Sequence, residues 1–306
     1  YPISRSYFKF IEMNTDYNLI NSNEQTNYAY IAEAPGGFLQ AVLSLRLDNF
    51  NSKNDTHTVI TLNKPTSIKI NKKINFSNID NINYFYGSNN SGDITDDITR
   101  KEYIDLFKDN KADIITADGG ISTIGREFHQ EQIHYRIILN EIIIALSIQK
   151  KGGSFILKLF SFNTEITIGY IYILSMYYNE INICKPLCSR GTNSEKYLIC
   201  KNFKGIELNE INSLETINSF MKLNENVTSI INISNVLFYT DLQKINDIIN
   251  ISQIKYIKDT LSFINEYEFI SENIKNQYID LILKLKHIKI INWAKINKLN
   301  IYNINI

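Results

Sequence analysis

Apolar runs of strand length alternate with amphipathic stretches over the first two thirds of the chain. The strand-like runs are residues 28–34, 57–63, 81–87, 112–118, 153–160, 180–186 and 195–203. Stretches with helical spacing are residues 4–13, 38–46, 102–109, 127–150 and 164–178. Because strands and helices of these lengths alternate, the pattern predicts an α/β fold whose mostly parallel sheet carries helices on both faces. The last two runs are also compatible with an antiparallel hairpin that closes the sheet.

The pattern changes at about residue 204, where stretches rich in Asn and Ile with helical spacing replace the alternation. We therefore predict a domain at residues 1–204, followed by a mainly helical C-terminal extension at residues 205–306. Within the extension, residues 278–300 combine an apolar stripe with several lysines. Such a segment could be an RNA-binding arm, but a solvated helix face is favoured, because basic helices are common.

Composition indicates a globular protein without a global attraction to nucleic acid. Apolar residues make up 44% of the 306 residues, which is enough to bury a core. Lysine plus arginine and aspartate plus glutamate number 32 each, so any contact with RNA must come from a local patch. Cys184, Cys188 and Cys200 have no histidine-rich cluster nearby, and we expect reduced thiols and no metal site.

Neither a membrane span nor a signal peptide is expected. No apolar run approaches the ~20 residues that a span needs, and the N-terminus lacks a charged segment followed by an apolar one. We therefore expect an intracellular protein with no membrane partner. The chain begins with Tyr1 and not with Met, as a segment cut from a longer parent chain would.

A glycine turn follows the first strand-like run. Ala34, Pro35, Gly36 and Gly37 end this run, and helical spacing begins at Phe38. Glycines let a ligand approach the backbone closely, and the following helix offers unpaired N–H groups, as a nucleotide-like cofactor requires. The turn lacks the GxGxxG spacing of dinucleotide folds, which disfavours a nicotinamide cofactor. An ordinary tight turn would explain the same residues equally well.

Two charged residues end or interrupt apolar runs. Asp118 ends the run at 112–118 before two glycines, which places it at the carboxyl edge where open α/β sheets bind ligands. Lys158 interrupts the run at 153–160, and a buried lysine needs a carboxylate or a cleft beside it. We expect both in a functional site, although Asp118 could instead cap a turn and Lys158 could reach solvent at a sheet edge.

Lys9 and Glu195 are less informative by themselves. Lys9 lies three residues before Glu12 in a stretch typical of a helix that Ser4 or Ser6 caps, which is the spacing of an exposed ion pair. Glu195 begins the last strand-like run. These two residues have a functional interpretation only together with Asp118 and Lys158, in one shared site.

The order and setting of these residues resemble the FtsJ-like (RrmJ-type) ribose 2′-O-methyltransferases. The stretches that carry the resemblance are EAPGGF (33–38), DDITRKEYI (96–104), ADGGIS (117–122), ALSIQKKGGSFILKLF (145–160) and KPLCSRGTNSEKYLICK (185–201). Together they run from about Lys9 to Lys204, which is roughly two thirds of the chain. The chain is similar to the branch of eukaryotes and large DNA viruses that methylates the first nucleotides of capped messenger RNA.

This resemblance implies a Rossmann-like methyltransferase fold with a mostly parallel seven-stranded sheet and an antiparallel closing strand. It implies S-adenosyl-L-methionine as the cofactor. It matches the family's catalytic tetrad to Lys9, Asp118, Lys158 and Glu195. It matches the cofactor-binding residues to Glu33, Ala34, Pro35, Gly36, Gly37 and Phe38, with Asp97 at the adenine and Asp118 at the sulfonium. Where many relatives have an acid for the cofactor ribose, this chain has Leu62, Asn63 and Lys64.

The implied reaction moves a methyl group from a sulfonium to a ribose hydroxyl, whose oxygen must line up with the methyl carbon while its proton is drawn away. A lysine can act on such a hydroxyl when desolvation and a neighbouring positive charge lower its pKa. In this hypothesis Lys158 is the base or the hydroxyl-steering group, Lys9 supplies the neighbouring charge, and Asp118 and Glu195 orient the ammonium groups. The reaction requires no metal.

The implied partners are capped mRNA or other RNA, other capping enzymes, and domains of a longer parent chain. Arg190, Asn193 and Ser194, in the loop before Glu195, are candidate substrate contacts, although the loop could be only a polar turn. The implied location is the cytoplasm, including a viral factory or virion, or the nucleus. Two alternatives remain: a methyltransferase of ribosomal or transfer RNA, and a non-catalytic RNA-binding scaffold subunit of a capping complex, which a complete tetrad disfavours.

Overall fold

The computed structural model describes residues 2–20, 24–47, 50–71, 81–224 and 226–299. The chain divides into two compact units. The first unit comprises Tyr1–Ser189 and Ser194–Asp247, and the second comprises Arg190–Asn193 and Ile248–Ile306. Among the described helices, none combines the length and the apolar character that a membrane span requires.

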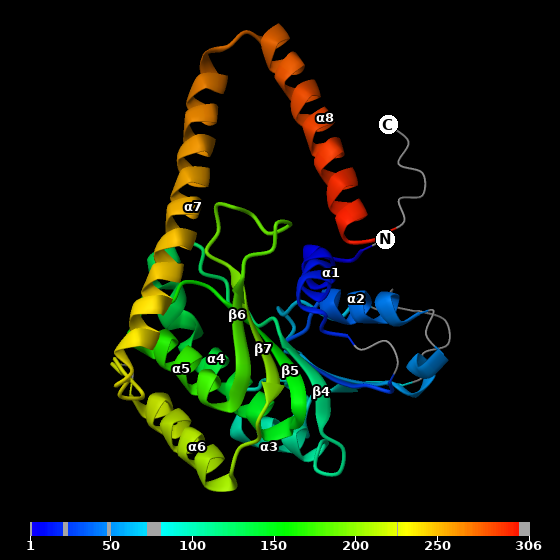
Figure 1. The fold of residues 1–306 in the computed structure, drawn as a ribbon, viewed down its shortest axis with the longest axis vertical. Helices are drawn as coiled ribbons and strands as arrows, with labels where there is room; N and C mark the ends of the chain where they lie inside the picture. The colour runs from blue at the N-terminus through cyan, green and yellow to red at the C-terminus, as the bar shows by residue number, and fades with distance from the viewer. Residues whose placement is uncertain (1, 21–23, 48–49, 72–80, 225, 300–306) are drawn as a thin grey trace. The chain divides into compact units, whose positions relative to one another are not determined.

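A seven-stranded sheet forms the centre of the first unit, with the strand order β3-β2-β1-β4-β5-β7-β6 (Figure 1). The strands are β1 (Asn27–Ile31), β2 (Thr56–Ile60), β3 (Ile82–Phe85), β4 (Ala112–Ala117), β5 (Gln149–Leu159), β6 (Tyr178–Cys184) and β7 (Lys196–Phe203). Strands β1 to β5 pair in parallel, whereas β7 is antiparallel to both β5 and β6. The predicted seven-stranded sheet with an antiparallel closing strand is therefore confirmed.

Helices cover both faces of this sheet. Those of the first unit are α1 (Arg5–Tyr17), α2 (Gly37–Arg46), α3 (Asp97–Asp105), α4 (Gln130–Ile148), α5 (Glu165–Tyr177) and α6 (Leu208–Leu223). The 3-10 helices η1 (Phe50–Asn54) and η2 (Glu127–His129) precede β2 and α4. Helices α1 and α2 pack together on one face, and α3, α4 and α5 cover the other (Figure 1). Helix α7 (Val236–Phe269) begins in the first unit, and α8 (Glu272–Ile296) belongs to the second.

Helix α6 belongs to the first unit because it packs on α4. Residues 138–146 of α4 are buried without interruption, since the sheet covers one side of the helix and other helices cover the rest. The buried Asn140 side chain donates a hydrogen bond to Asn218 of α6 at 3.1 Å. By packing, therefore, the first unit continues past residue 204. The domain boundary that the sequence pattern predicts at residue 204 stays a prediction.

Two elements begin earlier than their sequence pattern predicts. Helix α3 starts at Asp97, because the side chain of Asp96 accepts a hydrogen bond from the Thr99 N–H at 2.9 Å and so caps the first turn. Strand β5 starts at Gln149, and its register against β4 shifts near Gly152, which has a φ of 82°. Such a bulge breaks the alternation by which a strand is identified in a sequence.

Candidate active site

The carboxyl ends of the central strands bring two of the four tetrad residues to one edge of the sheet. Asp118 directly follows β4, and its N–H donates to the carbonyl oxygen of Ile31 at the end of β1, at 3.3 Å. Lys158 lies near the end of β5, the next strand along. The order of the strands reverses between β1 and β4, and α/β sheets bind ligands at such a reversal. The site therefore lies where the fold predicts it.

Lys158 and Asp118 form an ion pair at this edge. The Lys158 Nζ donates to the backbone oxygen of Asp118 at 2.7 Å and lies 3.2 Å from its carboxylate Oδ1. Their side chains are only 11% and 17% exposed, which strengthens the attraction between the charges. A Cβ atom on Gly120 would lie 3.1 Å from the Lys158 Nζ, so a glycine at this position leaves room for the ammonium group.

Lys9 and Glu195 form the second ion pair of the tetrad. The Lys9 Nζ, on α1, lies 2.5 Å from Oε1 of Glu195, which immediately precedes β7, and both side chains are buried or nearly so. The Ser189 hydroxyl also contacts this carboxylate at 3.3 Å. The exposed pair of Lys9 with Glu12 does not form, because Glu12 accepts hydrogen bonds from the N–H groups of Leu187 and Cys188 instead.

Tyr197 joins the two ion pairs into one network. Its buried hydroxyl donates to Oδ1 of Asp118 at 2.9 Å and accepts from the Lys9 Nζ at 3.4 Å. Sequence reasoning missed this residue, because a tyrosine in an apolar strand is expected to be part of the hydrophobic core. The signal was its spacing: residues two apart on a strand point to the same face, so Tyr197 follows Glu195 into the site.

The charges around Glu195 shift the pKa of its neighbours as well as its own. Burial works to raise the pKa of Glu195, but the charge of Lys9 and the hydrogen bond from it prevail and hold that pKa below its usual range. The Lys185 Nζ donates to the backbone oxygen of Glu195 at 2.7 Å. Burial, together with the positive charge of Lys9, lowers the pKa of Lys185 to about 8 against the opposing effect of Glu195.

Two buried carboxyl groups flank the tetrad. Oε1 of Glu33 accepts a hydrogen bond from the Leu39 N–H at 2.9 Å, and Oε1 of Glu141 accepts one from the Gly119 N–H at 3.1 Å. The second oxygen of each is buried and has no partner among the described residues. Burial raises the pKa of each group to about 8. Sequence reasoning missed Glu141, although a carboxylate inside the apolar helix α4 was a visible signal.

The glycine turn after β1 connects the cofactor-binding residues to Lys9. Gly36 has a φ of 106°, which favours glycine, and α2 begins at Gly37. A Cβ atom on Gly37 would lie 2.0 Å from the Ser6 Oγ of α1, so α1 and α2 approach each other more closely here than any other residue would allow. Phe38 is fully buried. Its ring packs against the rings of Phe10 on α1 and Tyr197 on β7, at centroid distances of 5.5 and 5.7 Å.

The loops after β2 and β3 supply a carboxylate that sequence reasoning missed. The residues after β2 offer no acid, but the Lys64 Nζ lies 3.1 Å from Oδ2 of Asp93, in the loop that follows β3. A Cβ atom on Gly92 would lie 1.9 Å from the Thr61 backbone oxygen, so the two loops are in direct contact. Asp93 is therefore a further candidate for a polar contact with the cofactor.

The structure places the other predicted site residues as follows. Asp97 lies in the first turn of α3, where its carboxylate pairs with Arg100 and with Lys222 of α6, each at 3.1 Å. Ser194, which immediately precedes Glu195, donates a hydrogen bond to the Gln130 side chain at 2.6 Å. Arg190 and Asn193 belong to the second unit. The roles of these residues at the adenine and the RNA stay predictions.

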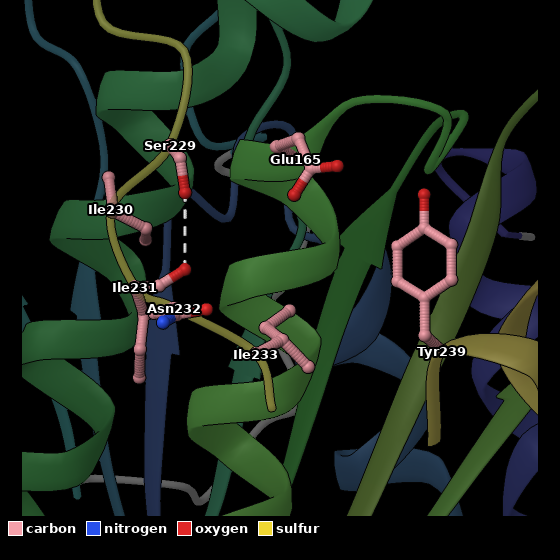
Figure 2. Close-up of a pocket in the computed structure, with 7 residues that line it drawn as sticks. All are labelled: Glu165, Ser229, Ile230, Ile231, Asn232, Ile233 and Tyr239. Carbon is pink, nitrogen blue, oxygen red and sulfur yellow. Dashed lines mark hydrogen bonds between the residues drawn. The ribbon is translucent and has the colours of Figure 1, made fainter. Parts of the chain in front are cut away.

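A further cavity of about 570 Å³ is lined by residues outside the tetrad (Figure 2). Its lining combines Glu165 in the first turn of α5 with the segment 229–233 and Tyr239 of α7. None of its lining residues is cationic, and no tetrad residue is among them. In the described part of the chain, no group of three His, Cys, Asp or Glu side chains could hold a metal ion.

Known proteins share this architecture. In Dictyostelium discoideum, a cap-specific mRNA (nucleoside-2′-O-)-methyltransferase 1 is 34% identical over 158 residues, which are 51% of this chain and 21% of that protein. The human protein of the same name is 32% identical over 186 residues, 58% of this chain and 21% of that protein. The chain thus spans about a fifth of the length of these relatives.

A solved structure and a family model agree on the fold. A crystal structure of a ribosomal RNA methyltransferase from Plasmodium falciparum matches with a TM-score of 0.50 and 21% identity, covering 67% of this chain and all of that one. The model of the FtsJ-like methyltransferases matches residues 2–203, which contain all four tetrad residues. The chain therefore belongs to the FtsJ-like methyltransferase family.

Proposed function

We propose that this chain methylates a ribose 2′-hydroxyl of RNA, and that its substrate is the first transcribed nucleotide of capped mRNA. The observation that carries the proposal is the tetrad itself: two lysine–carboxylate pairs, joined through the Tyr197 hydroxyl, at the ligand-binding edge of the sheet. An isolated buried charge is costly, so two such pairs in one place need a function or a well-matched network. A methyl transfer to a hydroxyl would use both the buried charges and their fixed arrangement.

S-adenosyl-L-methionine is the cofactor of this family, and the residues after β1 fit it. Gly36 and Gly37 allow a ligand to approach the backbone, and Oε2 of Glu33 is a buried acceptor without a protein partner among the described residues. We assign Glu33 to Phe38, with Asp97 and Asp118, to its binding. Bound there, the cofactor supplies an electrophilic methyl group on a sulfonium.

Lys158 is the residue that we assign to the reacting hydroxyl. An ammonium group has three N–H donors, and Asp118 receives two contacts from this one. The remaining direction can hold the ribose 2′-oxygen, which Lys158 orients as an ammonium or deprotonates as an amine. Asp118 fixes the position of Lys158, and Tyr197 fixes the position of Asp118.

Lys9 and Glu195 are assigned to the ribose end of the site. Because Lys9 and Lys158 both contact the Asp118–Tyr197 pair, their positive charges lie close together and repel each other. Glu195 limits this repulsion by pairing with Lys9. The tetrad thus keeps two lysines in a largely buried site without leaving either charge unpaired.

Capped mRNA is the substrate that the relatives favour, since those from Dictyostelium discoideum and human are named as cap-specific enzymes. The overall charge of the chain is balanced, so the RNA must be held by a local surface. Ser194 immediately precedes Glu195 of the tetrad, and Arg190 and Asn193 precede Ser194 in the same loop. We expect the protein to act in the nucleus or the cytoplasm, with other capping enzymes or with further domains of a longer chain.

The test is transfer of a labelled methyl group to three short RNAs of one sequence, which carry a 7-methylguanosine cap, an unmethylated cap or no cap. Nuclease mapping then locates the label. We expect cap-dependent label on the 2′-oxygen of the first nucleotide. Equal label on uncapped RNA would contradict the requirement for a cap and favour ribosomal or transfer RNA as the substrate. No label despite intact cofactor binding would contradict the proposed methyltransferase activity and favour the role of a scaffold subunit.

A further inference from the structure

The described residues 248–299, hereafter the arm, form a helical hairpin whose apolar side chains are largely uncovered. The arm contains the second part of α7 and all of α8, which meet at the turn around Ile270 and diverge from it (Figure 1). Beside this turn, the rings of Phe263 and Tyr278 pack edge to face at a centroid distance of 6.3 Å and line an apolar cavity of about 370 Å³. The two helices therefore do not cover each other's apolar surface along their length.

The uncovered side chains follow the spacing of helices that pack against other helices. On α8 the stripe alternates steps of four and three residues, and on α7 it alternates steps of three and four. The α8 stripe is Ile274, Tyr278, Leu281, Leu285 and Ile288, and the α7 stripe is Ile254, Ile257, Leu261 and Ile264. Every one of these side chains is at least 37% exposed. The lysines of α8 lie on an exposed helix, and the solvated face expected for this segment stays a prediction beside its exposed apolar stripe.

The amount of exposed apolar surface is that of a protein interface. Eighteen large apolar side chains of the arm are at least 37% exposed. At roughly half of a large side chain each, they expose on the order of 1,500 Å². A typical monomer has a largest apolar patch of roughly 300–600 Å², and a stable complex needs roughly 800 Å² per partner. The nine side chains of the two stripes carry about half of this exposed area, which is close to the roughly 800 Å² that one partner of a stable complex buries.

Charge is divided sharply along the arm. The tip, residues 259–280, contains five carboxylates and one lysine, for a net charge of −4. The base, residues 248–258 and 281–299, contains seven lysines and no carboxylate, for a net charge of +7. On α7 the tip (259–269) and the base (248–258) have the same length, and on α8 the base (281–296) is longer than the tip (272–280).

We propose that the arm is a dimerisation element, in which two copies of this chain pack their arms antiparallel around a two-fold axis as a four-helix bundle. The acidic tip of each arm then lies against the basic base of the other, and the apolar stripes form the shared core. A parallel pairing would bring two tips of −4 together and two bases of +7 together, which is repulsive. The charge pattern thus matches a second copy in one orientation.

The test measures the mass of the full chain by analytical ultracentrifugation, together with two charge-reversed variants. The tip variant carries Glu266→Lys, Glu268→Lys and Glu272→Lys, and the base variant carries Lys284→Glu, Lys286→Glu, Lys289→Glu and Lys295→Glu. The first changes the tip from −4 to +2, and the second changes the base from +7 to −1. Lys108→Glu, which reverses an exposed charge after the end of α3, is the control.

We expect twice the chain mass for the unchanged protein and for Lys108→Glu. Each arm variant alone should dissociate at least about tenfold more readily, because like charges then face each other. An equimolar mixture of the two should associate again, since the tip of the base variant still fits the base of the tip variant. This rescue separates a lost interface from a misfolded arm, and helix content from circular dichroism checks each variant.

Several results would overturn the proposal. One is an unchanged protein that is monomeric at all concentrations, and another is a pair of arm variants that stay dimeric when alone. A third is a mixture that does not associate although both variants keep their helix content. If the unchanged protein is monomeric and the base variant loses binding to single-stranded RNA, the arm is an RNA-binding surface and not a dimer interface.

Discussion

Glu141 lies in the apolar helix α4 and is fully buried next to the tetrad, and Glu141→Gln should change how the stability of the fold depends on pH. The glutamine keeps an acceptor for the Gly119 N–H and has nearly the same shape, but it cannot ionise. In the unchanged protein, burial raises the pKa of Glu141 from 4.5 to about 8. The substitution therefore removes a titration and little else.

The sign and the size of the effect follow from that shift. Between about pH 4.5 and about pH 8, the folded state holds the Glu141 proton and the unfolded state has lost it, so the free energy of unfolding falls as pH rises. At 1.36 kcal/mol per pKa unit, the loss reaches at most about 3 kcal/mol by pH 7 and about 5 kcal/mol above pH 8. Near pH 4.5 and below, both proteins should have similar free energies of unfolding.

Urea unfolding from pH 5 to pH 9 measures this dependence. We expect Glu141→Gln to be more stable than the unchanged protein at pH 8.5, with a difference that shrinks toward pH 5. Asp109→Asn, which removes an exposed carboxylate after α3, is the control and should keep the profile of the unchanged protein. Parallel profiles for Glu141→Gln and the unchanged protein would refute the assigned burial and ionisation of this group.

Three further substitutions test the tetrad, the contact between α1 and α2, and the ion pairs of α3. Tyr197→Phe removes the bridge between the ion pairs and should lower kcat about tenfold with little change in KM, the equivalent of ~1.4 kcal/mol for a hydrogen bond to a charged group; an unchanged kcat would exclude the bridge. Gly37→Ala forces a Cβ atom against the Ser6 Oγ, so it should displace Lys9 and weaken both cofactor binding and transfer, which calorimetry and a transfer assay measure. Arg100→Met leaves the carboxylates around a 1% exposed guanidinium without their partner and should lower the free energy of unfolding by about 3 kcal/mol or more in a urea titration.

The sequence was sufficient to predict the sheet and two of the tetrad residues. Central parallel strands are almost wholly apolar, so Asp118 at the end of one and Lys158 within another stand out. The glycine turn was equally visible, because its residues interrupt a strand–helix transition. These signals are local, and local patterns survive in a single sequence.

The rest of the site depends on contacts between distant segments. Lys9 and Glu195 are 186 residues apart, and only the packing of α1 against the start of β7 makes them a pair. Tyr197 could not be told from a core tyrosine, because its role depends on which hydrogen-bond partners the fold brings to it. The arm shows the same limit: its helices follow from the pattern, but the exposure of their apolar stripes does not.

The central claim is that Lys158 acts on the ribose hydroxyl, and its most direct test compares the unchanged protein with Lys158→Ala in two assays. One is transfer of a labelled methyl group from S-adenosyl-L-methionine to capped RNA, and the other is calorimetric binding of the same cofactor. We predict that transfer falls at least about 100-fold, as for a lost general acid or base, while the dissociation constant of the cofactor stays within a few-fold. Undiminished transfer by Lys158→Ala would contradict the mechanism.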